Sequence, residues 1–295
     1  MTRTLRDRIG GAPISWGVCE VPGWGEMLPT ERVLPEMRSV GLTATELGAP
    51  GFFPEESEGI GRVLAEHDMT LIGGFVPLVL QDPAQRADAL ERAETVARLF
   101  SDHGATHFVT AVVQDYDWST PIPLDAEGMA VLGQGLREVD EVCARHGLTQ
   151  VLHPHVGTLV ETRADMELAM EHTDVKWCLD TGHVYIGGID PVEFARQHAD
   201  RVAHAHLKDV DAAIAGRLMS GELTLLQAVQ AGLFKALGTG DVPIGEAVAA
   251  LEAQGYDGWY VLEQDCALTD GVPDEGEGPI HDVRQSMGFL SGLAS

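Results

Sequence analysis

The sequence predicts an α/β protein that forms one (β/α)8 TIM barrel over residues 1–295. Short β-prone runs alternate with longer helical patterns along almost the whole chain, which is typical of βαβ units and a parallel sheet. No linker or low-complexity segment indicates a second domain. A chain of 295 residues with 44% hydrophobic residues can bury the core of one such barrel.

Eight strand–helix repeats follow one another in the sequence. The strands are expected at 10–16, 44–48, 69–80, 106–113, 151–155, 177–183, 203–209 and 259–265. The helical patterns between them include 30–41, 55–67, 84–103 and 124–147. The seventh crossover, from Val210 to Gly255, is longer than the others. Its glycine-rich stretch GLFKALGTGDVPIG is interpreted as an active-site loop.

The last four strands each place an ionisable residue where the strand should stop: His153, Asp180, His206 and Glu263. The carboxyl ends of parallel barrel strands lie on one side, where TIM barrels carry their active sites. We therefore expect these residues to converge as ligands of a divalent metal. Two imidazoles and two carboxylates suit Mn(II), Co(II), Zn or Fe(II) better than Ca(II). Taken alone, each has a plainer explanation: Asp180 could fix a turn, and Glu263 could pair with Lys208.

Five more residues are candidates for contact with a substrate. His155 and His183 lie just beyond two predicted ligands and could reach a substrate or orient those ligands. Lys208 could lean over the site or form a salt bridge at the rim. Glu46 and Trp16, at the ends of the second and first strands, are weaker candidates for the substrate wall, and packing is an equally good reading of the tryptophan.

Charge and segment composition limit the partners. The chain has 19 basic and 46 acidic residues, for a formal charge of −27, which disfavours nucleic acid and anionic membranes as partners. A small neutral substrate stays compatible, because a bound metal would dominate the local field. The first residues lack the apolar run of a signal peptide, and four scattered cysteines fit a cytoplasmic protein with reduced thiols. A homo-oligomer, as dimer or tetramer, is left open.

Several motifs resemble a known family. HPHVGT, DTGH, HLKDV and GYDGWYVLEQD resemble the xylose isomerase-like barrels, a superfamily of sugar isomerases, epimerases and inosose dehydratases. The resemblance runs nearly end to end, from GAPISWG through LGTGDVPIGEAV, and is strongest to the inosose dehydratases of inositol catabolism. It implies a metal-dependent enzyme of carbohydrate metabolism, with manganese or cobalt as the first choices of metal.

One position departs from the epimerases of this superfamily. In ketose epimerases the ligand on strand five is a glutamate, which pairs with the strand-eight glutamate as two bases on opposite faces of the substrate. Here that position is His153, while Glu263 remains. Asp180 and His206 match metal ligands, and His183 matches a substrate-contacting histidine. The loss of one of two matched carboxylates favours an asymmetric reaction such as elimination of water.

The resemblance therefore implies a lyase that dehydrates 2-keto-myo-inositol to a trihydroxycyclohexane-1,2-dione through an enediolate. Glu263 is the expected base, with Lys208 as the alternative, and His155 or His183 would protonate the departing hydroxyl. Three other functions stay open: a ketose or inosose isomerase or epimerase, β-elimination from a 3-keto-glycoside, and a catalytically silent sugar-binding or assembly subunit. A DNA-repair endonuclease of this fold is disfavoured by the charge of the chain.

Overall fold

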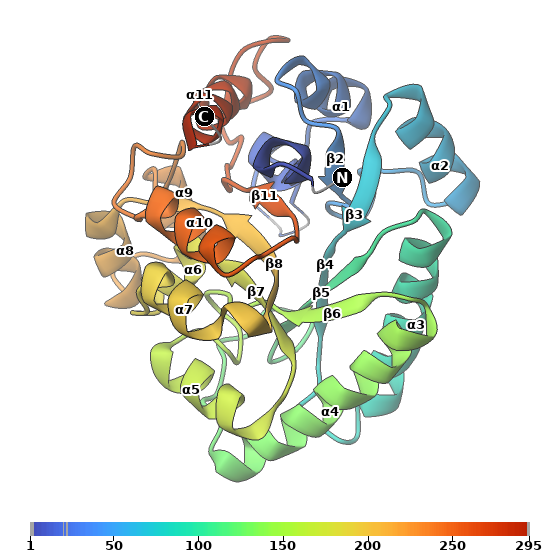
Figure 1. Ribbon diagram of the computed structural model, residues 1–295, viewed down its shortest axis with the longest axis vertical. Helices are drawn as coiled ribbons and strands as arrows, with labels where there is room; N and C mark the ends of the chain where they lie inside the picture. The colour runs from blue at the N-terminus through green and yellow to red at the C-terminus, as the bar shows by residue number, and fades with distance from the viewer. Residues whose placement is uncertain (1–2, 20, 22, 294–295) are drawn as a thin grey trace.

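The computed structural model describes residues 3–19, 21 and 23–293. Parallel strands surround the centre and helices cover them on the outside (Figure 1). This arrangement confirms the predicted barrel. The strands of the barrel are β1 (Ile9–Gly11), β2 (Ala44–Glu46), β3 (Thr70–Gly73), β4 (Phe75–Leu78), β5 (His107–Val112), β6 (Thr149–Leu152), β7 (Lys176–Asp180), β8 (Val202–Leu207) and β11 (Tyr260–Leu262).

The barrel closes through a strand that is broken in two. The sheet order is β3-β2-β1-β11-β8-β7-β6-β5-β4, so its two edges are consecutive pieces of the predicted third strand, 69–80. Strand β5 and the residue before it join both pieces: the amide of Thr106 donates to Ile72 O at 3.2 Å and that of Val109 to Gly74 O at 3.1 Å. A Cβ on Gly73 would lie 2.5 Å from the carbonyl oxygen of His107, so glycine permits this close approach.

Other expected boundaries also shift. The first strand, predicted at 10–16, ends at Gly11 and is followed by a 3₁₀ turn, η2 (Pro13–Trp16). Pro13 explains the change, because it has no N–H to give to a strand ladder. The last strand, β11, ends at Leu262, one residue before Glu263. The predicted helices of the first half are present as α1 (Thr30–Ser39), α2 (Ser57–Glu66), α3 (Arg86–Asp102) and α4 (Ala126–Arg145).

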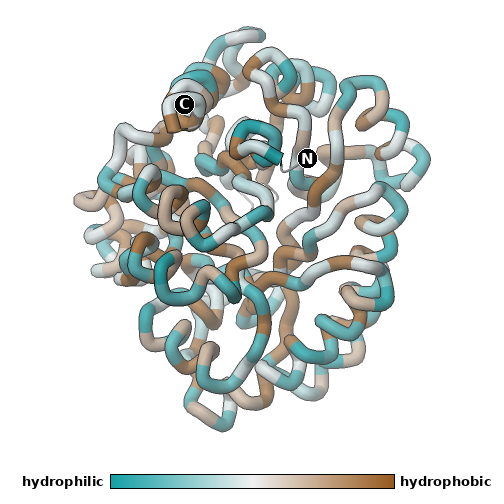
Figure 2. The backbone as a smooth tube through the Cα atoms, in the orientation of Figure 1, coloured by the Kyte–Doolittle hydropathy of each residue, from teal (hydrophilic) through white to brown (hydrophobic). Residues whose placement is uncertain are grey.

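The helices of the second half pack outside the strands that carry the candidate site. They are α5 (Arg163–His172), α6 (Thr181–Ile186), α7 (Pro191–His198), α8 (Ala212–Met219), α9 (Leu225–Gln230), α10 (Ile244–Ala253) and α11 (Pro279–Leu293), with 3₁₀ turns η1 (Leu5–Arg8) and η3 (Ala199–Arg201). Hydrophobic residues concentrate along the strands and the inward helix faces, whereas outer turns are hydrophilic (Figure 2). Among the described helices, none is long and apolar enough to cross a membrane.

The long seventh crossover is anchored to the end of β8 by one carboxylate. It contains an antiparallel pair, β9 (Asp209–Val210) and β10 (Phe234–Lys235), with α8 and α9 between them. The buried side chain of Asp209 accepts backbone N–H groups from Gly238 at 2.8 Å, Gly240 at 2.9 Å and Val242 at 3.1 Å. The glycine-rich loop therefore folds directly against the residue that follows Lys208.

Replacement of Asp209 by alanine should loosen this loop, because three backbone amides would lose their acceptor. We expect the free energy of unfolding to fall by about 3 kcal/mol, since hydrogen bonds to a charged group contribute about 1.5–3 kcal/mol each and water replaces some of them. Urea denaturation and amide exchange at Gly238 and Gly240 measure the effect. Asp211→Ala, which removes the cap of α8 and a partly exposed ion pair with Lys235, is the control and should cost about 1 kcal/mol. Equal losses in both variants, with unchanged exchange, would contradict the anchoring role.

Candidate active site

The four predicted metal ligands lie on neighbouring strands at one end of the barrel. His153 follows β6, Asp180 ends β7, His206 lies in β8 and Glu263 follows β11. Asp180 is in register with His206, and His206 with Val261, so these strand ends lie side by side. The side chains are buried: 1% of His153 and His206, none of Asp180 and 13% of Glu263 is exposed.

Their polar atoms converge on one point. Nε2 of His153 lies 3.3 Å from Oδ2 of Asp180, and the same oxygen lies 3.7 Å from Nδ1 of His206. Nδ1 of His206 contacts Oε2 of Glu263. These last two atoms are buried and make no hydrogen bond, so their polar capacity is unused. Asp180, His206 and Glu263 offer one nitrogen and two carboxylate oxygens within 4.8 Å of one another, a donor set that fits a divalent transition-metal ion, and His153 contacts this set through Asp180.

Glu46 fixes the orientation of the His206 ring from below. The imidazoles of His206 and His204 donate from Nε2 to Oε1 of Glu46, at 3.0 and 2.8 Å. Nδ1 of His206 is thereby turned toward Asp180 and Glu263, an arrangement that carboxylate–histidine–metal sites use. Burial alone would raise the pKa of Glu46, but the adjacent histidines outweigh it and hold this pKa well below its usual value. Contact between Glu46 and a substrate stays a prediction.

Lys208 lies inside the site rather than at its rim. Its side chain is fully buried, with Nζ 2.9 Å from Asp265, 3.4 Å from both Asp180 and Glu263, and 3.1 Å from Nε2 of His183. Burial alone would lower the pKa of Lys208, yet the three carboxylates raise it, so the ammonium group stays protonated. Burial also raises the pKa of Asp265 to about 6, against the opposing effect of Lys208.

Asp265 is a member of this cluster that the sequence analysis missed. It lies two residues beyond Glu263 and is 8% exposed. The sequence offered one signal, since two acidic residues spaced by two on an extended segment share a face. This signal was not sufficient, because β11 ends before Glu263 and the sequence does not determine how the segment 263–265 continues.

His155 and His183 pack against each other beside the cluster, with ring centroids 3.9 Å apart and planes tilted by 37°. Backbone groups of Val156 hold both rings. Nδ1 of His155 donates to the carbonyl oxygen of Val156 at 2.7 Å, and the amide of Val156 donates to Nδ1 of His183 at 3.3 Å. Burial, with added repulsion from His153 and Lys208, lowers the pKa of His155 to about 3. Burial and nearby positive groups also lower the pKa of His183. Both imidazoles are therefore neutral.

Trp16 has a clear packing role. It is fully buried in the core, and its indole N–H donates to Oε2 of Glu36 in α1 at 2.8 Å. The nearby backbone also supports the site, because the hydroxyl of Ser15 accepts the amide of Gln264 at 2.9 Å. Trp16 thus braces the first strand against α1. Contact of its ring with a substrate stays a prediction.

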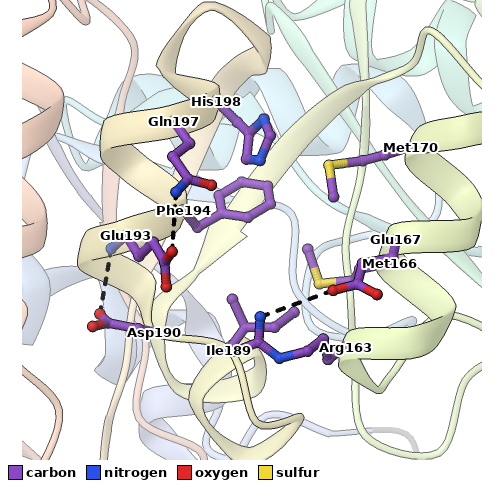
Figure 3. Close-up of a pocket in the computed structure, with 10 residues that line it drawn as sticks. All are labelled: Arg163, Met166, Glu167, Met170, Ile189, Asp190, Glu193, Phe194, Gln197 and His198. Carbon is purple, nitrogen blue, oxygen red and sulfur yellow. Dashed lines mark hydrogen bonds and ion pairs between the residues drawn. The ribbon is translucent and has the colours of Figure 1, made fainter.

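A separate groove lies on the outside of the barrel between α5 and α7 (Figure 3). Its apolar side chains come from Met166, Met170 and Phe194, and four of its polar side chains form two pairs. Arg163 lies 3.9 Å from Glu167, and the amide of Gln197 donates to Glu193 at 3.0 Å. None of the converging residues lines this groove, so it does not belong to the candidate active site.

Comparisons with known proteins agree with this fold and show the family. The family described as xylose isomerase-like TIM barrel matches residues 34–292, and the chain belongs to that family. It is 30% identical over 268 residues to the inosose dehydratase of Geobacillus kaustophilus (strain HTA426), covering 87% of this chain and 86% of the relative. It is 33% identical over 267 residues to the rhizopine catabolism protein MocC of Rhizobium meliloti, covering 87% and 81%.

Solved structures show the same fold at lower identity. The probable 3-DHS dehydratase AsbF from Bacillus anthracis superposes with a TM-score of 0.71 at 16% identity, covering 96% of this chain and 98% of that one. An L-ribulose 3-epimerase superposes with a TM-score of 0.71 at 17% identity, covering 97% and 94%. These similarities support the barrel and leave the choice of reaction to the residues of the site.

Glu46→Gln should weaken metal binding although Glu46 is not itself a predicted ligand. The amide can turn its NH₂ toward His206 and disturb the ring, and loss of such a partner typically costs 10–100-fold in metal affinity. Titration of the metal-free protein with Mn(II), followed by electron paramagnetic resonance, measures the dissociation constant. Glu36→Gln changes another buried carboxylate, beside Trp16, and should leave that constant within about threefold of wild type. An unchanged constant in Glu46→Gln would refute the orienting role.

Proposed function

We propose that the protein is a metal-dependent hydro-lyase that removes water from a keto-inositol, converting 2-keto-myo-inositol to a trihydroxycyclohexane-1,2-dione. The observation that carries the proposal is the asymmetry of the site. One carboxylate, Glu263, and a buried ammonium group, Lys208, lie together on one side, 3.4 Å apart. His153 stands where a symmetric two-base site would need a second carboxylate.

The donor set of His153, Asp180, His206 and Glu263 would hold the divalent cation, with Mn(II) or Co(II) as first choices and Zn or Fe(II) as alternatives. When bound, the cation would act as a Lewis acid that stabilises negative charge on a ketone oxygen and so acidifies the neighbouring C–H bond. Asp180, whose pKa is held low by Lys208 and adjacent histidines despite its burial, stays ionised for this purpose.

Glu263 is the proposed base. Its Oε2 contacts His206, whereas Oε1 faces Lys208 at 3.4 Å and is the oxygen left to accept a proton. Burial would raise the pKa of Glu263, but His206 and Lys208 outweigh it and lower that pKa to about 2. The carboxylate is therefore ionised at neutral pH and can remove the proton from the carbon next to the ketone.

Lys208 is the proposed source of the proton for the departing hydroxyl, in place of the expected His155 or His183, because both imidazoles have lowered pKa values. Nζ of Lys208 lies 3.1 Å from Nε2 of His183, and because Nδ1 of the neutral ring accepts the amide of Val156, Nε2 carries the ring proton. The ammonium group itself would therefore give its proton to the hydroxyl. His155, whose Nδ1–H is committed to a carbonyl, can accept a hydrogen bond from a substrate hydroxyl at Nε2. As the C–H electrons form the new double bond, the C–O bond breaks and the hydroxyl leaves as water.

The comparisons support the proposal without naming the substrate of this chain. Relatives named inosose dehydratase match it at 25–30% identity over most of its length. The acidic composition fits a small neutral keto-polyol better than a phosphorylated sugar or a nucleic acid. A cytoplasmic enzyme, with a homo-oligomer left open, completes the proposal.

Proton NMR in D2O of the Mn-loaded protein with 2-keto-myo-inositol tests the reaction class. We expect loss of one ring hydroxyl and appearance of the dione. Deuterium incorporation with all hydroxyls retained would instead identify an isomerase or epimerase, with His153 as the second base. No change with this substrate would contradict the proposal and direct the search to keto-glycosides.

Glu263→Gln should lose both turnover and metal affinity, because the amide cannot accept the carbon-bound proton and is a weaker ligand. We expect turnover to fall by about 10²–10⁴-fold, the usual contribution of a positioned base. The dehydration assay and a metal titration give the two values. Glu246→Gln makes the same chemical change on the exposed face of α10 and should behave as wild type. Activity near wild type in Glu263→Gln would remove it from the mechanism.

A further inference from the structure

Two aromatic side chains stand beside the predicted ligands, and the proposed reaction does not use them. The ring of Phe75, at the start of β4, lies 5.7 Å from that of His153 at an angle of 89° and 5.6 Å from that of His155. Trp118, in the loop between β5 and α4, stacks on Phe75 with centroids 6.1 Å apart and planes 12° apart. Phe75 and Trp118, both partly exposed, form an aromatic wall next to the site.

The loop holds Trp118 in an unfavourable backbone conformation. Its φ is +57°, in the left-handed region that residues with bulky side chains avoid. The carboxylate of Asp115 fastens the turn by accepting the amides of Asp117 and Ser119, each at 3.0 Å, and the amide of Trp118 donates to the carbonyl of Asp115 at 3.3 Å. Such conformations persist where the surrounding structure enforces them, often at ligand sites.

A second aromatic residue of the same loop, Tyr116, is placed differently from Trp118. The ring of Tyr116 lies over the guanidinium of Arg92 in α3, 5.0 Å from its centre, and 42% of the residue is exposed. Trp118 instead lies 6.0 Å from the ring of His155. Two residues apart in sequence, one aromatic ring points to an outer helix and the other to the site.

The chemistry of the site changes from one side to the other. His155 lies between the aromatic wall and His183, and His183 contacts Lys208 at 3.1 Å. A ligand there would meet aromatic rings on one side and an ammonium–carboxylate cluster on the other. Aromatic faces are electron-rich and attract polarised C–H bonds. A saturated ring with equatorial hydroxyls suits this arrangement, because its faces present axial C–H bonds and its edge presents hydroxyls.

We propose that Phe75 and Trp118 form a stacking platform for the C–H face of a ring-shaped polyol. The platform makes carbocyclic keto-polyols, rather than open-chain ketoses, the substrates of this site. The inference rests on the proposed function, because it takes the keto-polyol to bind above His153. In 2-keto-myo-inositol all five hydroxyls are equatorial, so both ring faces carry axial C–H bonds. An open-chain ketose offers no rigid face of this kind.

Steady-state kinetics of Mn-loaded variants test the platform. In Trp118→Ala we expect KM for 2-keto-myo-inositol to rise about tenfold while kcat stays within about threefold, since the platform touches the ring and not the reacting groups. Trp118→Phe should recover most of the affinity. Tyr116→Ala, the matched loss of a ring from the same loop, should leave both constants unchanged. A proportional loss of kcat in Trp118→Ala, or no rise in KM, would overturn the platform.

A binding measurement separates this inference from the proposed reaction. Saturation of aromatic protein protons should transfer magnetisation to the axial protons of myo-inositol, which has no ketone and cannot react. The transfer should drop at least threefold in Trp118→Ala. L-Erythrulose, a ketose too short to form a ring, should give equal transfer in wild type and variant. Transfer that is equal for myo-inositol in both proteins would refute the platform, whatever the enzyme does to the keto-inositol. Normal transfer without dehydration of 2-keto-myo-inositol would refute the reaction alone.

Discussion

The candidate site depends on a buried ammonium group. Lys208 is fully buried within 3.4 Å of three carboxylates, those of Asp180, Glu263 and Asp265. Burying a charge is costly unless it is paired, and each member of this cluster supplies the compensation that the others require. The cluster therefore keeps Asp180 and Glu263 ionised in a site that excludes most water. A barrel that lost the lysine would leave uncompensated acidic groups at the point where the predicted ligands converge.

Two further buried carboxylates, those of Asp209 and Glu46, support the site from beneath. Asp209, directly after Lys208, uses its carboxylate to collect backbone amides from the glycine-rich loop. Glu46, from the opposite direction, uses its carboxylate to hold two histidines. Asp209 and Glu46 are engaged in these hydrogen bonds, whereas Lys208 pairs with Asp180, Glu263 and Asp265. Asp209 and Glu46 therefore support the site, whereas Glu263 is the acidic residue proposed to act on the substrate.

The sequence predicted the convergence of His153, Asp180, His206 and Glu263 because it follows from topology alone. Residues at the carboxyl ends of neighbouring parallel strands must meet, however the loops run. The break in the strand 69–80 was not predictable in the same way. The continuous apolar run there is compatible with one strand, and only the close approach of Gly73 to β5 makes it two.

Side chains beyond the strand ends were harder to place because loop conformation decides where they point. Strand alternation gives the face on which Lys208 lies but not its partner, and Asp265 comes from a segment with no regular structure. The aromatic wall is a stronger example. Phe75 becomes visible once the third strand is divided, but Trp118 reaches the site only through a left-handed residue that no sequence pattern marks.

The arrangement of polar and aromatic groups bears on the choice between elimination and epimerisation. Epimerisation by two bases needs ionised groups on both faces of a carbon, as two matched carboxylates would supply. Here Nε2 of His153 is directed at Asp180 and its ring packs against Phe75, so this nitrogen is engaged by a carboxylate. Burial lowers the pKa of His153 despite the adjacent carboxylate. An imidazole held in that way suits a ligand better than a base. With proton-accepting and proton-donating groups gathered on the side of Glu263 and Lys208, the geometry favours removal of a proton and a hydroxyl over exchange of a proton between faces.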